Sequence, residues 1–414
     1  MAQLPRGEEA PADGLIPAAF DSSNSTFHAY VHIPYCLTRC GYCDFNTYTA
    51  SELGGNSRSD YYQQVIKEIE FSKKVLDESG IKPRPISTIF FGGGTPTLLD
   101  AEHLIAIYEA LVGTFGILAD AEVTTEANPD SVNREYLQKL KDAGFTRVSF
   151  GMQSAVPKVL QVLERTHNPE NVTLNVAHAQ EVGLSTSVDL IYGSPGEGLL
   201  DWEESLKAAI ALNTDHISAY SLIVEPGTKL FRQISSGELP EPDEDLHADM
   251  YLLAENMLAD VGFTNYEVSN WAKDFGARSA HNIAYWQSQD WWGYGPGAHS
   301  HVSGVRWWNV KHPAAYSERI SAGVSPALER EIVDAANREV EKVMLETRLV
   351  QGVDLNWLKA RGFANAKAVA ELIADELVVP SQIFEGKVVL TVKGRLLADH
   401  VIRKLLELHE SEGK

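Results

Sequence analysis

The sequence has only three cysteines in 414 residues, and all three lie in the stretch CLTRCGYC, at Cys36, Cys40 and Cys43. Clustered thiols in odd number form no disulfide framework and are open to damaging oxidation outside a reducing compartment. Long apolar runs are also absent: none approaches the roughly 20 residues that cross a bilayer, and the N-terminus lacks a basic segment followed by an apolar one. We therefore expect a cytoplasmic protein.

Basic residues are scarce. The chain has 35 Lys and Arg against 57 Asp and Glu, a formal charge of -22. A polyanion would be repelled over most of such a surface, so we expect no nucleic-acid partner. An enzyme that modifies RNA would need a concentrated basic channel, and the sequence contains none. With 44% hydrophobic residues, the chain can bury one large core and a smaller second one.

Six apolar, β-branched runs predict buried strands, with helical patterns of i, i+3, i+4 spacing between them. Strand and helix alternate, which predicts an α/β fold with a parallel sheet, open or closed into a barrel, built from six β/α units. The six runs are HAYVHI from residue 28, ISTIFF from 86, AEVTTE from 121, TRVSFG from 146, STSVDLIYG from 185 and DHISAYSLI from 215.

Parallel sheets bind ligands at the carboxyl ends of their strands. Each run here is followed by polar or glycine-rich residues, which ordinary strand-ending turns would also explain one by one. Together they predict a single site that combines thiols, a glycine loop and hydrogen-bonding side chains. In chain order they are the three cysteines, the loop GGGTPT at 92–97, Glu126, Gln153, Asp189 and Tyr220.

The spacing C-x3-C-x2-C allows three thiolates from one loop to converge on one metal centre. A zinc site of three cysteines with His28 or His32 is one interpretation, although a second ligand pair of the usual spacing is missing. A 4Fe-4S cluster is the other: three thiolates leave one iron open. The amino and carboxylate groups of S-adenosylmethionine (SAM) can chelate that iron.

CLTRCGYC followed by FFGGGTPTLL resembles the radical SAM superfamily, whose fold is a partial (β/α)6 barrel. The resemblance implies that the cysteines hold the cluster and that the backbone of Gly93, Gly94 and Thr95 meets the methionine amino group. Tyr42 would lie beside the adenine. For Arg165 the alternative is an ion pair with its neighbour Glu164. When the motifs of this sequence are matched with those of the superfamily, the resemblance implies five further SAM-contacting positions: Tyr30, Glu126, Gln153, Arg165 and Asp189.

The resemblance covers about residues 27 to 410 and is closest to the oxygen-independent coproporphyrinogen III oxidase group and its heme-chaperone branch. The motifs that carry it are HIPYC, CGYCDF, GGGTPT, EANPDS, GMQS and GYGPGAHS. The oxidases resemble this chain but have a fourth cysteine two residues after the third, where this chain has Phe45, and an N-terminal extension. Both departures favour the chaperone and an absence of coproporphyrinogen III oxidase activity. Oxidative decarboxylation of coproporphyrinogen III is the alternative.

The segment AHNIAYWQ contains His281, Asn282, Tyr285 and Trp286, which match the H-N-x-x-Y-W motif associated in that branch with heme binding. Six of the eight tryptophans lie between residues 271 and 308. The alternative is an aromatic core with hydrogen-bonded histidines. With the motif, we expect heme as a ligand and His281 as its iron ligand. The implied partners are apo-hemoproteins, expected at the respiratory chain beside the membrane, and a low-potential electron donor; a homodimer is left open.

The C-terminal pattern differs from the rest. Helical stretches flank SQIFEGKVVLTVKG at 381–394, which predicts a short hairpin in a small helical, winged domain with a lid or docking role. The expected division is a disordered leader over 1–26, a radical SAM barrel over 27–235, an aromatic-rich heme or substrate-binding region over 236–320 and a helical, winged-like domain over 321–414.

Overall fold

The computed structural model describes residues 7–17, 22, 24–52 and 58–407. The six apolar runs form six parallel strands side by side in chain order, so the predicted β/α units are confirmed. Their β-branched and aromatic side chains are mostly buried, as parallel strands covered by helices require. The strands are β2 (Phe27–Ile33), β3 (Ile86–Gly93), β4 (Ile117–Ala127), β5 (Arg147–Gln153), β6 (Ser185–Tyr192) and β7 (His216–Ser221).

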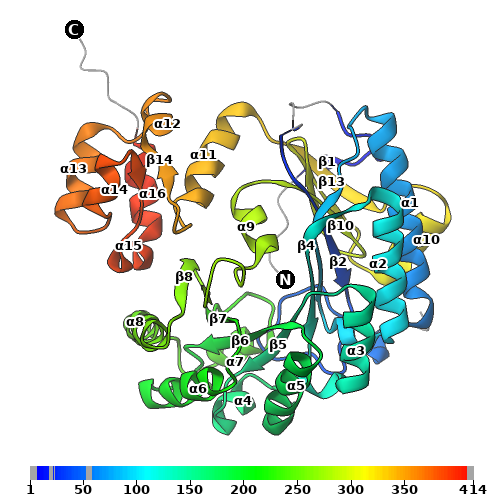
Figure 1. The fold of residues 1–414 in the computed structure, drawn as a ribbon, viewed down its shortest axis with the longest axis horizontal. Helices are drawn as coiled ribbons and strands as arrows, with labels where there is room; N and C mark the ends of the chain where they lie inside the picture. Colours follow the sequence, from blue (N-terminus) through cyan, green and yellow to red (C-terminus); the bar gives the residue numbers. More distant parts are fainter. Residues whose placement is uncertain (1–6, 18–21, 23, 53–57, 408–414) are drawn as a thin grey trace.

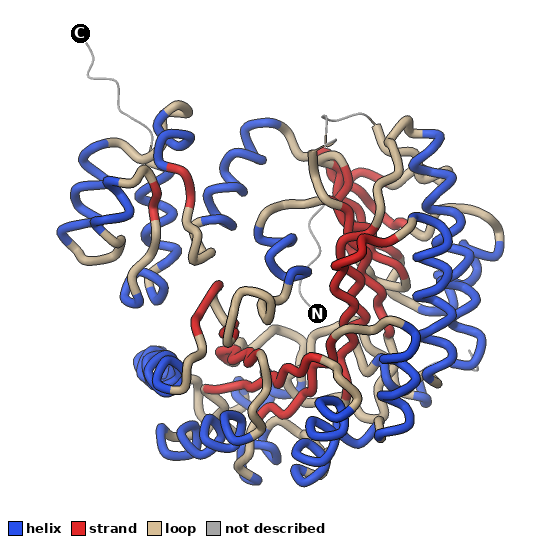
Figure 2. The backbone as a smooth tube through the Cα atoms, viewed as in Figure 1, coloured by secondary structure: helices blue, strands red, loops and turns tan. Residues whose placement is uncertain are grey.

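Helices cover the outer side of the curved sheet (Figure 1). The apolar faces of most of them join the strands in one large core, and those of the fourth and seventh form a smaller cluster with Ile191 and Leu222. The tube in Figure 2 shows the strands as a curved band with these helices outside it. The helices are α1 (Tyr61–Glu78), α2 (Ala101–Phe115), α3 (Arg134–Ala143), α4 (Pro157–Val162), α5 (Pro169–Glu181), α6 (Leu199–Ala211), α7 (Lys229–Ser235) and α8 (Glu244–Asp260).

The aromatic-rich segment extends this sheet and is not a separate region. One edge continues with β10 (Asp290–Tyr294), parallel to β2, followed by β11 (His299–Val302), β12 (Val305–Asn309) and β13 (Ala327–Ile332). The other edge continues with β9 (Asn270–Ala272) and β8 (Thr264–Glu267). The sheet thus forms a partial barrel, with β1 and β8 outermost in its strand order. Between these additions, α9 (Ala280–Trp286) lies on the concave side, whereas α10 (Pro313–Ser321) packs on α1 (Figure 1).

The leader is ordered over its described part, which corrects the expectation of disorder from composition. Strand β1 (Glu8–Glu9) pairs antiparallel with β13, and Ile16 is buried in the main core. Arg330 on β13 forms an ion pair with Glu8. Amino-acid composition does not predict this order, because an open sheet edge orders any backbone segment that pairs with it. Residues 1–6, 18–21 and 23 of the predicted leader lie outside the described residues.

The C-terminal residues form a smaller unit with its own core. The predicted hairpin is wrong: residues 380–384 and 392–396 are helical, and β15 (Lys387–Val388) pairs with β14 (Val353–Asp354) instead. Pro380 and Thr391 begin these two helices, which short apolar runs did not distinguish from strands. The helices are α11 (Ala335–Glu346), α12 (Leu355–Lys359), α13 (Ala366–Ala374), α14 (Pro380–Phe384), α15 (Val392–Leu396) and α16 (Ala398–Leu406).

An ion pair joins the two units: Arg395 binds Glu255 on α8 at 2.6 Å. Within the described part of the chain, no helix has the length and apolar character needed to span a membrane.

Candidate functional site

The concave face of the sheet encloses a cavity of about 600 Å³. Side chains alternate across each strand, and the register places those of neighbouring strands in rows on this face. One such row runs from Glu126 through Ser149 and Ser187 to His216. The cysteine loop and the glycine loop close the carboxyl ends of β2 and β3, so all three cysteines line the same cavity.

Backbone contacts hold the cysteine loop in place. The N–H of Cys36 donates to the carbonyl of Tyr48 at 3.1 Å, and the N–H of Cys43 donates to the carbonyl of Cys40 at 3.2 Å. All three thiols are half-buried. Burial raises the pKa of Cys36 and raises that of Cys43 to about 11. Without a metal these two thiols are therefore protonated at neutral pH, and metal binding would release their protons.

The histidines of the zinc interpretation are already occupied. The ring nitrogens of His28 contact Thr26 and Thr88, and those of His32 contact Tyr30 and the carbonyl of Asn46. Across the described ranges, no three His, Cys, Asp or Glu side chains are grouped to hold a single metal ion.

The glycine loop passes close to β2. Gly93 has φ +108°, and a Cβ atom there would lie 2.5 Å from the ring of His32, so only glycine fits. The N–H groups of Gly94 and Thr95 donate to the carbonyls of Ile33 and Tyr35, both at 2.8 Å. A methionine ammonium only donates hydrogen bonds, so N–H groups cannot bind it. The loop would have to offer it carbonyl oxygens as acceptors.

Two buried carboxyl groups, Glu126 and Asp189, face the same cavity. Burial, and then the charge of Asp189, raises the pKa of Glu126 to about 8, although the N–H of Gly93 donates to it at 3.1 Å. Burial also raises the pKa of Asp189, which accepts a hydrogen bond from Ser149 at 2.8 Å. Both groups can thus bind ligand hydroxyls, and the protonated form of Glu126 can also donate a hydrogen bond.

Arg165 reaches toward the cluster loop. It donates to the carbonyl of Gly151 at 3.0 Å and contacts the sulfur of Cys40 at 3.6 Å, whereas Glu164 pairs with Lys229. The alternative pairing of Arg165 with Glu164 is therefore wrong. Its Nε is buried and has no hydrogen-bond partner among the described residues. Tyr42 and Gln153 complete the predicted lining, the latter at φ 63°, which non-glycine residues seldom adopt.

Two predicted site residues, Tyr30 and His281, do not line this cavity. The Tyr30 ring stacks on Phe90, which does line it, so Tyr30 lies one layer behind. His281 is 1% exposed, and its ring nitrogens contact Thr88 at 2.6 Å and Tyr285 at 2.9 Å. No ring nitrogen of His281 is available to bind iron in this conformation. The choice of His281 as the heme ligand thus does not fit the structure.

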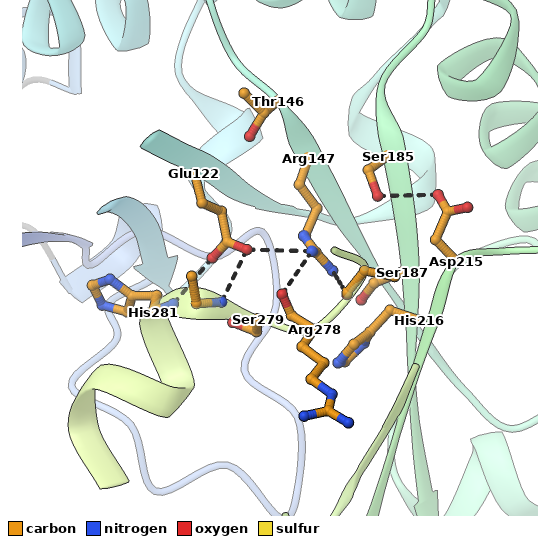
Figure 3. A network of polar contacts seen from close by, with 12 residues as sticks. Glu122, Thr146, Arg147, Ser185, Ser187, Asp215, His216, Arg278, Ser279 and His281 are labelled. Atoms are coloured by element: carbon orange, nitrogen blue, oxygen red, sulfur yellow. Dashed lines mark hydrogen bonds and ion pairs between the residues drawn. The ribbon is translucent and has the colours of Figure 1, made fainter. Parts of the chain in front are cut away.

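Arg147 was missed by the sequence analysis and links the cavity to α9. It is 4% exposed, lines the cavity and binds Glu122 at 3.2 Å and the carbonyl of Arg278 at 3.1 Å (Figure 3). Glu122 accepts the N–H groups of Ala280 and His281, each at 3.1 Å. The sequence RVSFGMQ contained a signal for this residue. Residues an even number of positions apart on a strand face the same side, so Arg147 is expected on the side of Gln153, up to the register shift that follows Gly151. This buried pair fastens α9 to the sheet.

A second cavity of about 450 Å³ lies where α9 meets the C-terminal unit. Asn282 and Tyr220 line both cavities and so separate them. Tyr285 and Trp286 of the H-N-x-x-Y-W motif also line it. Burial raises the pKa of Glu267 in its wall to about 7, while the Trp286 side chain donates a hydrogen bond to it. The remaining lining residues are Val268, Ser269, Asn270, Leu345 and Arg348.

Comparison with known proteins agrees with the predicted family. The profile described as "Radical SAM superfamily" matches residues 30–209. The "Heme chaperone HemW" of Mycobacterium tuberculosis is 42% identical over 96% of this chain and 99% of its own length. The protein of the same name from Bacillus subtilis is 32% identical over 91% of this chain and 98% of its own. Among solved structures, the coproporphyrinogen III oxidase HemN of Escherichia coli superimposes with a TM-score of 0.76 at 24% identity, covering 92% and 90% of the two chains.

Proposed function

Because the chain belongs to the HemW family of radical SAM proteins, we propose that it is a heme chaperone that binds heme and transfers it to apo-hemoproteins. The observation that carries the proposal is the 42% identity to a HemW heme chaperone over 96% of the chain. That span includes both cavities and the motif on α9. The HemN likeness at 24% identity supports the fold alone.

The first cavity is proposed to hold a 4Fe-4S cluster and SAM. Cys36, Cys40 and Cys43 would ligate three irons and leave the fourth iron open. Support comes from the cavity wall, where the buried Arg165 Nε and Thr124 Oγ1 have no hydrogen-bond partner in the described part of the chain, as expected of a site built for a polar ligand. SAM bound at a reduced cluster would accept an electron that breaks a carbon–sulfur bond.

We propose a role for each predicted residue that lines that cavity. Glu126 and Asp189 would accept hydrogen bonds from ribose hydroxyls, and Arg165 would pair with the methionine carboxylate. The loop of Gly93, Gly94 and Thr95 would hold the ammonium, with Gln153 and Tyr42 on the purine side. Tyr30 would act only indirectly, by supporting Phe90 behind the wall.

Heme is proposed to bind in the second cavity. Tyr285 and Trp286 offer aromatic faces for the macrocycle, and Arg348 supplies a cation for a propionate. Asn282 faces both cavities, which places the heme next to the proposed SAM site. Delivery would take place in the cytoplasm or at the membrane surface, to apo-hemoproteins of the respiratory chain, with a low-potential donor reducing the cluster.

Radical decarboxylation of coproporphyrinogen III is the second candidate, favoured by the predicted SAM-contacting residues that line the first cavity. Phe45 stands where that activity has a fourth cysteine in related proteins, and its side chain is 61% exposed. We therefore expect no turnover of coproporphyrinogen III.

The test is an anaerobic titration of heme into the cluster-reconstituted protein, followed at the Soret band, and then mixing with an apo-hemoprotein. The proposal expects saturable binding at a defined stoichiometry and transfer to the acceptor. Trp286→Leu should weaken heme binding at least about tenfold, because one aromatic face is lost. Trp357→Leu, in the C-terminal unit and away from both cavities, is the matched control. Absence of saturable binding, with turnover of coproporphyrinogen III, would establish the second candidate instead.

A further inference from the structure

A continuous chain of hydrogen bonds runs from the second cavity through the core to the surface. It begins at Tyr285 in the cavity wall and ends at the exposed Thr26. The intermediate side chains Thr88, His28 and His281 are 1%, 4% and 1% exposed. In order, the contacts are Tyr285 Oη to His281 Nε2 at 2.9 Å, His281 Nδ1 to Thr88 Oγ1 at 2.6 Å, Thr88 Oγ1 to His28 Nδ1 at 2.8 Å and His28 Nε2 to Thr26 Oγ1 at 2.7 Å.

The surface end of the chain determines its direction. The backbone N–H of Thr26 donates to Gln289 Oε1 at 2.8 Å, which identifies that atom as the amide oxygen. The hydroxyl of Thr26 donates to the same oxygen at 3.1 Å. A hydroxyl has one hydrogen, so both contacts of Thr26 Oγ1 are hydrogen bonds only when Nε2 of His28 is the donor to it.

The direction then propagates inward. Burial, and then the charge of Arg84, lowers the pKa of His28 to about 4, so the ring is neutral, and in this arrangement its proton is on Nε2. Its Nδ1 therefore accepts from the hydroxyl of Thr88, and Thr88 in turn accepts from Nδ1–H of His281. Burial also lowers the pKa of His281 well below its usual value, so its Nε2 carries a lone pair that accepts the hydroxyl of Tyr285.

Both nitrogens of His281 are thereby committed, one as a donor and one as an acceptor. The motif presents to the second cavity only Asn282, Tyr285 and Trp286, none of which carries an imidazole. Among the residues that line this cavity in the described structure, there is also no histidine, cysteine or methionine. Those are the side chains that most often bind heme iron.

We infer that the second cavity recognises the tetrapyrrole ring itself and not its iron, and that His281 is a positioning residue that holds the Tyr285 ring in the cavity wall. This inference rests on the proposed function and makes it more specific. The ligand class is a planar tetrapyrrole with acidic side chains, with or without a central metal. Aromatic contact and the cation Arg348 would hold it.

The first arm of the test needs no variant. Heme and iron-free protoporphyrin IX are titrated separately into the cluster-reconstituted protein, with quenching of tryptophan emission as the common readout. The inference expects the two dissociation constants to agree within about threefold. Binding of heme at least about thirtyfold tighter than the iron-free ring would overturn it. Absence of saturable binding by either ring would overturn the proposed function as well, so the two failures are distinguishable.

The second arm separates a positioning role from iron ligation by two matched variants. A glutamine amide reaches about as far as Nε2, so His281→Gln keeps an acceptor for Tyr285. An asparagine amide reaches only as far as Nδ1, so His281→Asn keeps the donor to Thr88 and loses the acceptor for Tyr285. The inference expects His281→Gln to bind both rings within about threefold of wild type, and His281→Asn to bind both at least about tenfold more weakly.

Iron ligation by His281 predicts a different pattern. Both variants would then lose heme, with a changed Soret band, and both would keep the iron-free ring. That result would overturn the inference. Two results together support the inference: an unchanged Soret position for heme bound to His281→Gln, and tighter ring binding by His281→Gln than by His281→Asn. A general loss of stability would not produce this pattern.

Discussion

Replacing Glu68 by glutamine should reduce the pH dependence of stability in the main sheet domain. Glu68 lies on α1 and is fully buried. Its carboxyl group accepts hydrogen bonds from the N–H of Gly295 at 2.7 Å, the amide of Asn309 at 2.8 Å and the hydroxyl of Tyr316 at 2.5 Å. It therefore joins α1 to the loop after β10, to β12 and to α10.

The magnitude follows from the pKa of Glu68. Burial raises that pKa from 4.5 to about 7, against the effect of its donors. Between these two values the unfolded chain releases the proton and the folded chain keeps it, so the free energy of unfolding falls as pH rises through this window. Each pKa unit corresponds to about 1.4 kcal/mol, so the loss amounts to about 3 kcal/mol, complete above about pH 8.

Glu68→Gln has no such proton to lose. At pH 5 the variant should be less stable than wild type by about 1 kcal/mol, because an amide group replaces one of the carboxyl acceptors. At pH 8 the difference should shift in favour of the variant by about 3 kcal/mol. The assay is chemical unfolding at pH 5 and pH 8, followed by tryptophan emission. Six of the eight tryptophans lie between residues 271 and 308, in and beside the strands that Glu68 supports.

Glu70→Gln is the matched control, because Glu70 is exposed on the same helix. Its difference from wild type should not change between the two pH values by more than a few tenths of a kcal/mol. An equal difference between Glu68→Gln and wild type at pH 5 and pH 8 would refute the argument from burial.

Three further changes test the site and its supports. Cys40→Ser should abolish the iron content and visible absorption obtained on anaerobic reconstitution, as an open-iron cluster has no ligand to spare. Gly93→Ala should destabilise the protein by more than Gly116→Ala, measured by thermal unfolding; both sites have positive φ, worth about 1–3 kcal/mol, but only Gly93 lacks space for a Cβ. Arg147→Met should cost about 3–5 kcal/mol of unfolding free energy by leaving the largely buried carboxylate of Glu122 without its cation, with only two N–H donors left.

Each of these has an outcome that contradicts it. Iron retained by Cys40→Ser would remove that residue from the proposed ligand set. Equal losses for Gly93→Ala and Gly116→Ala would mean that the contact with His32 carries no energy. For Arg147→Met the comparison is Lys139→Met, which breaks an exposed pair with Glu102 worth at most about 1 kcal/mol. Equal effects of the two would show that the buried pair does not fasten α9.

The sheet was predictable because its signals are local. Six β-branched runs with helical patterns between them require a parallel sheet, and the carboxyl ends of its strands meet at one edge. Most candidate site residues followed from that rule, since Glu126 and Gln153 stand at or next to strand ends, Asp189 lies in the second half of β6, and all three line the cavity. Arg147 escaped notice because it begins its strand and lies deeper along the same face.

The errors came from pairings between distant segments. The leader was predicted to be disordered from its composition, but β13 offers an open edge about 320 residues away, which Glu8 and Glu9 join. The C-terminal hairpin failed for the same reason, as β15 pairs with β14 and not with its neighbour. Such pairings depend on which edges the folded sheet leaves free, and no local pattern records that.

By itself, the sequence determined the chemistry available to this protein: three thiols within eight residues, a glycine-rich loop after the second strand and the H-N-x-x-Y-W motif, all readable as spacing. Tertiary structure alone decided how those groups are used. The hydrogen bond of His281 to Thr88 joins residues almost 200 positions apart, and together with the bond to Tyr285 on its own helix it turns the histidine of that motif into the core. A motif specifies which side chains are present, whereas burial and hydrogen-bond partners decide which of their atoms a ligand can reach.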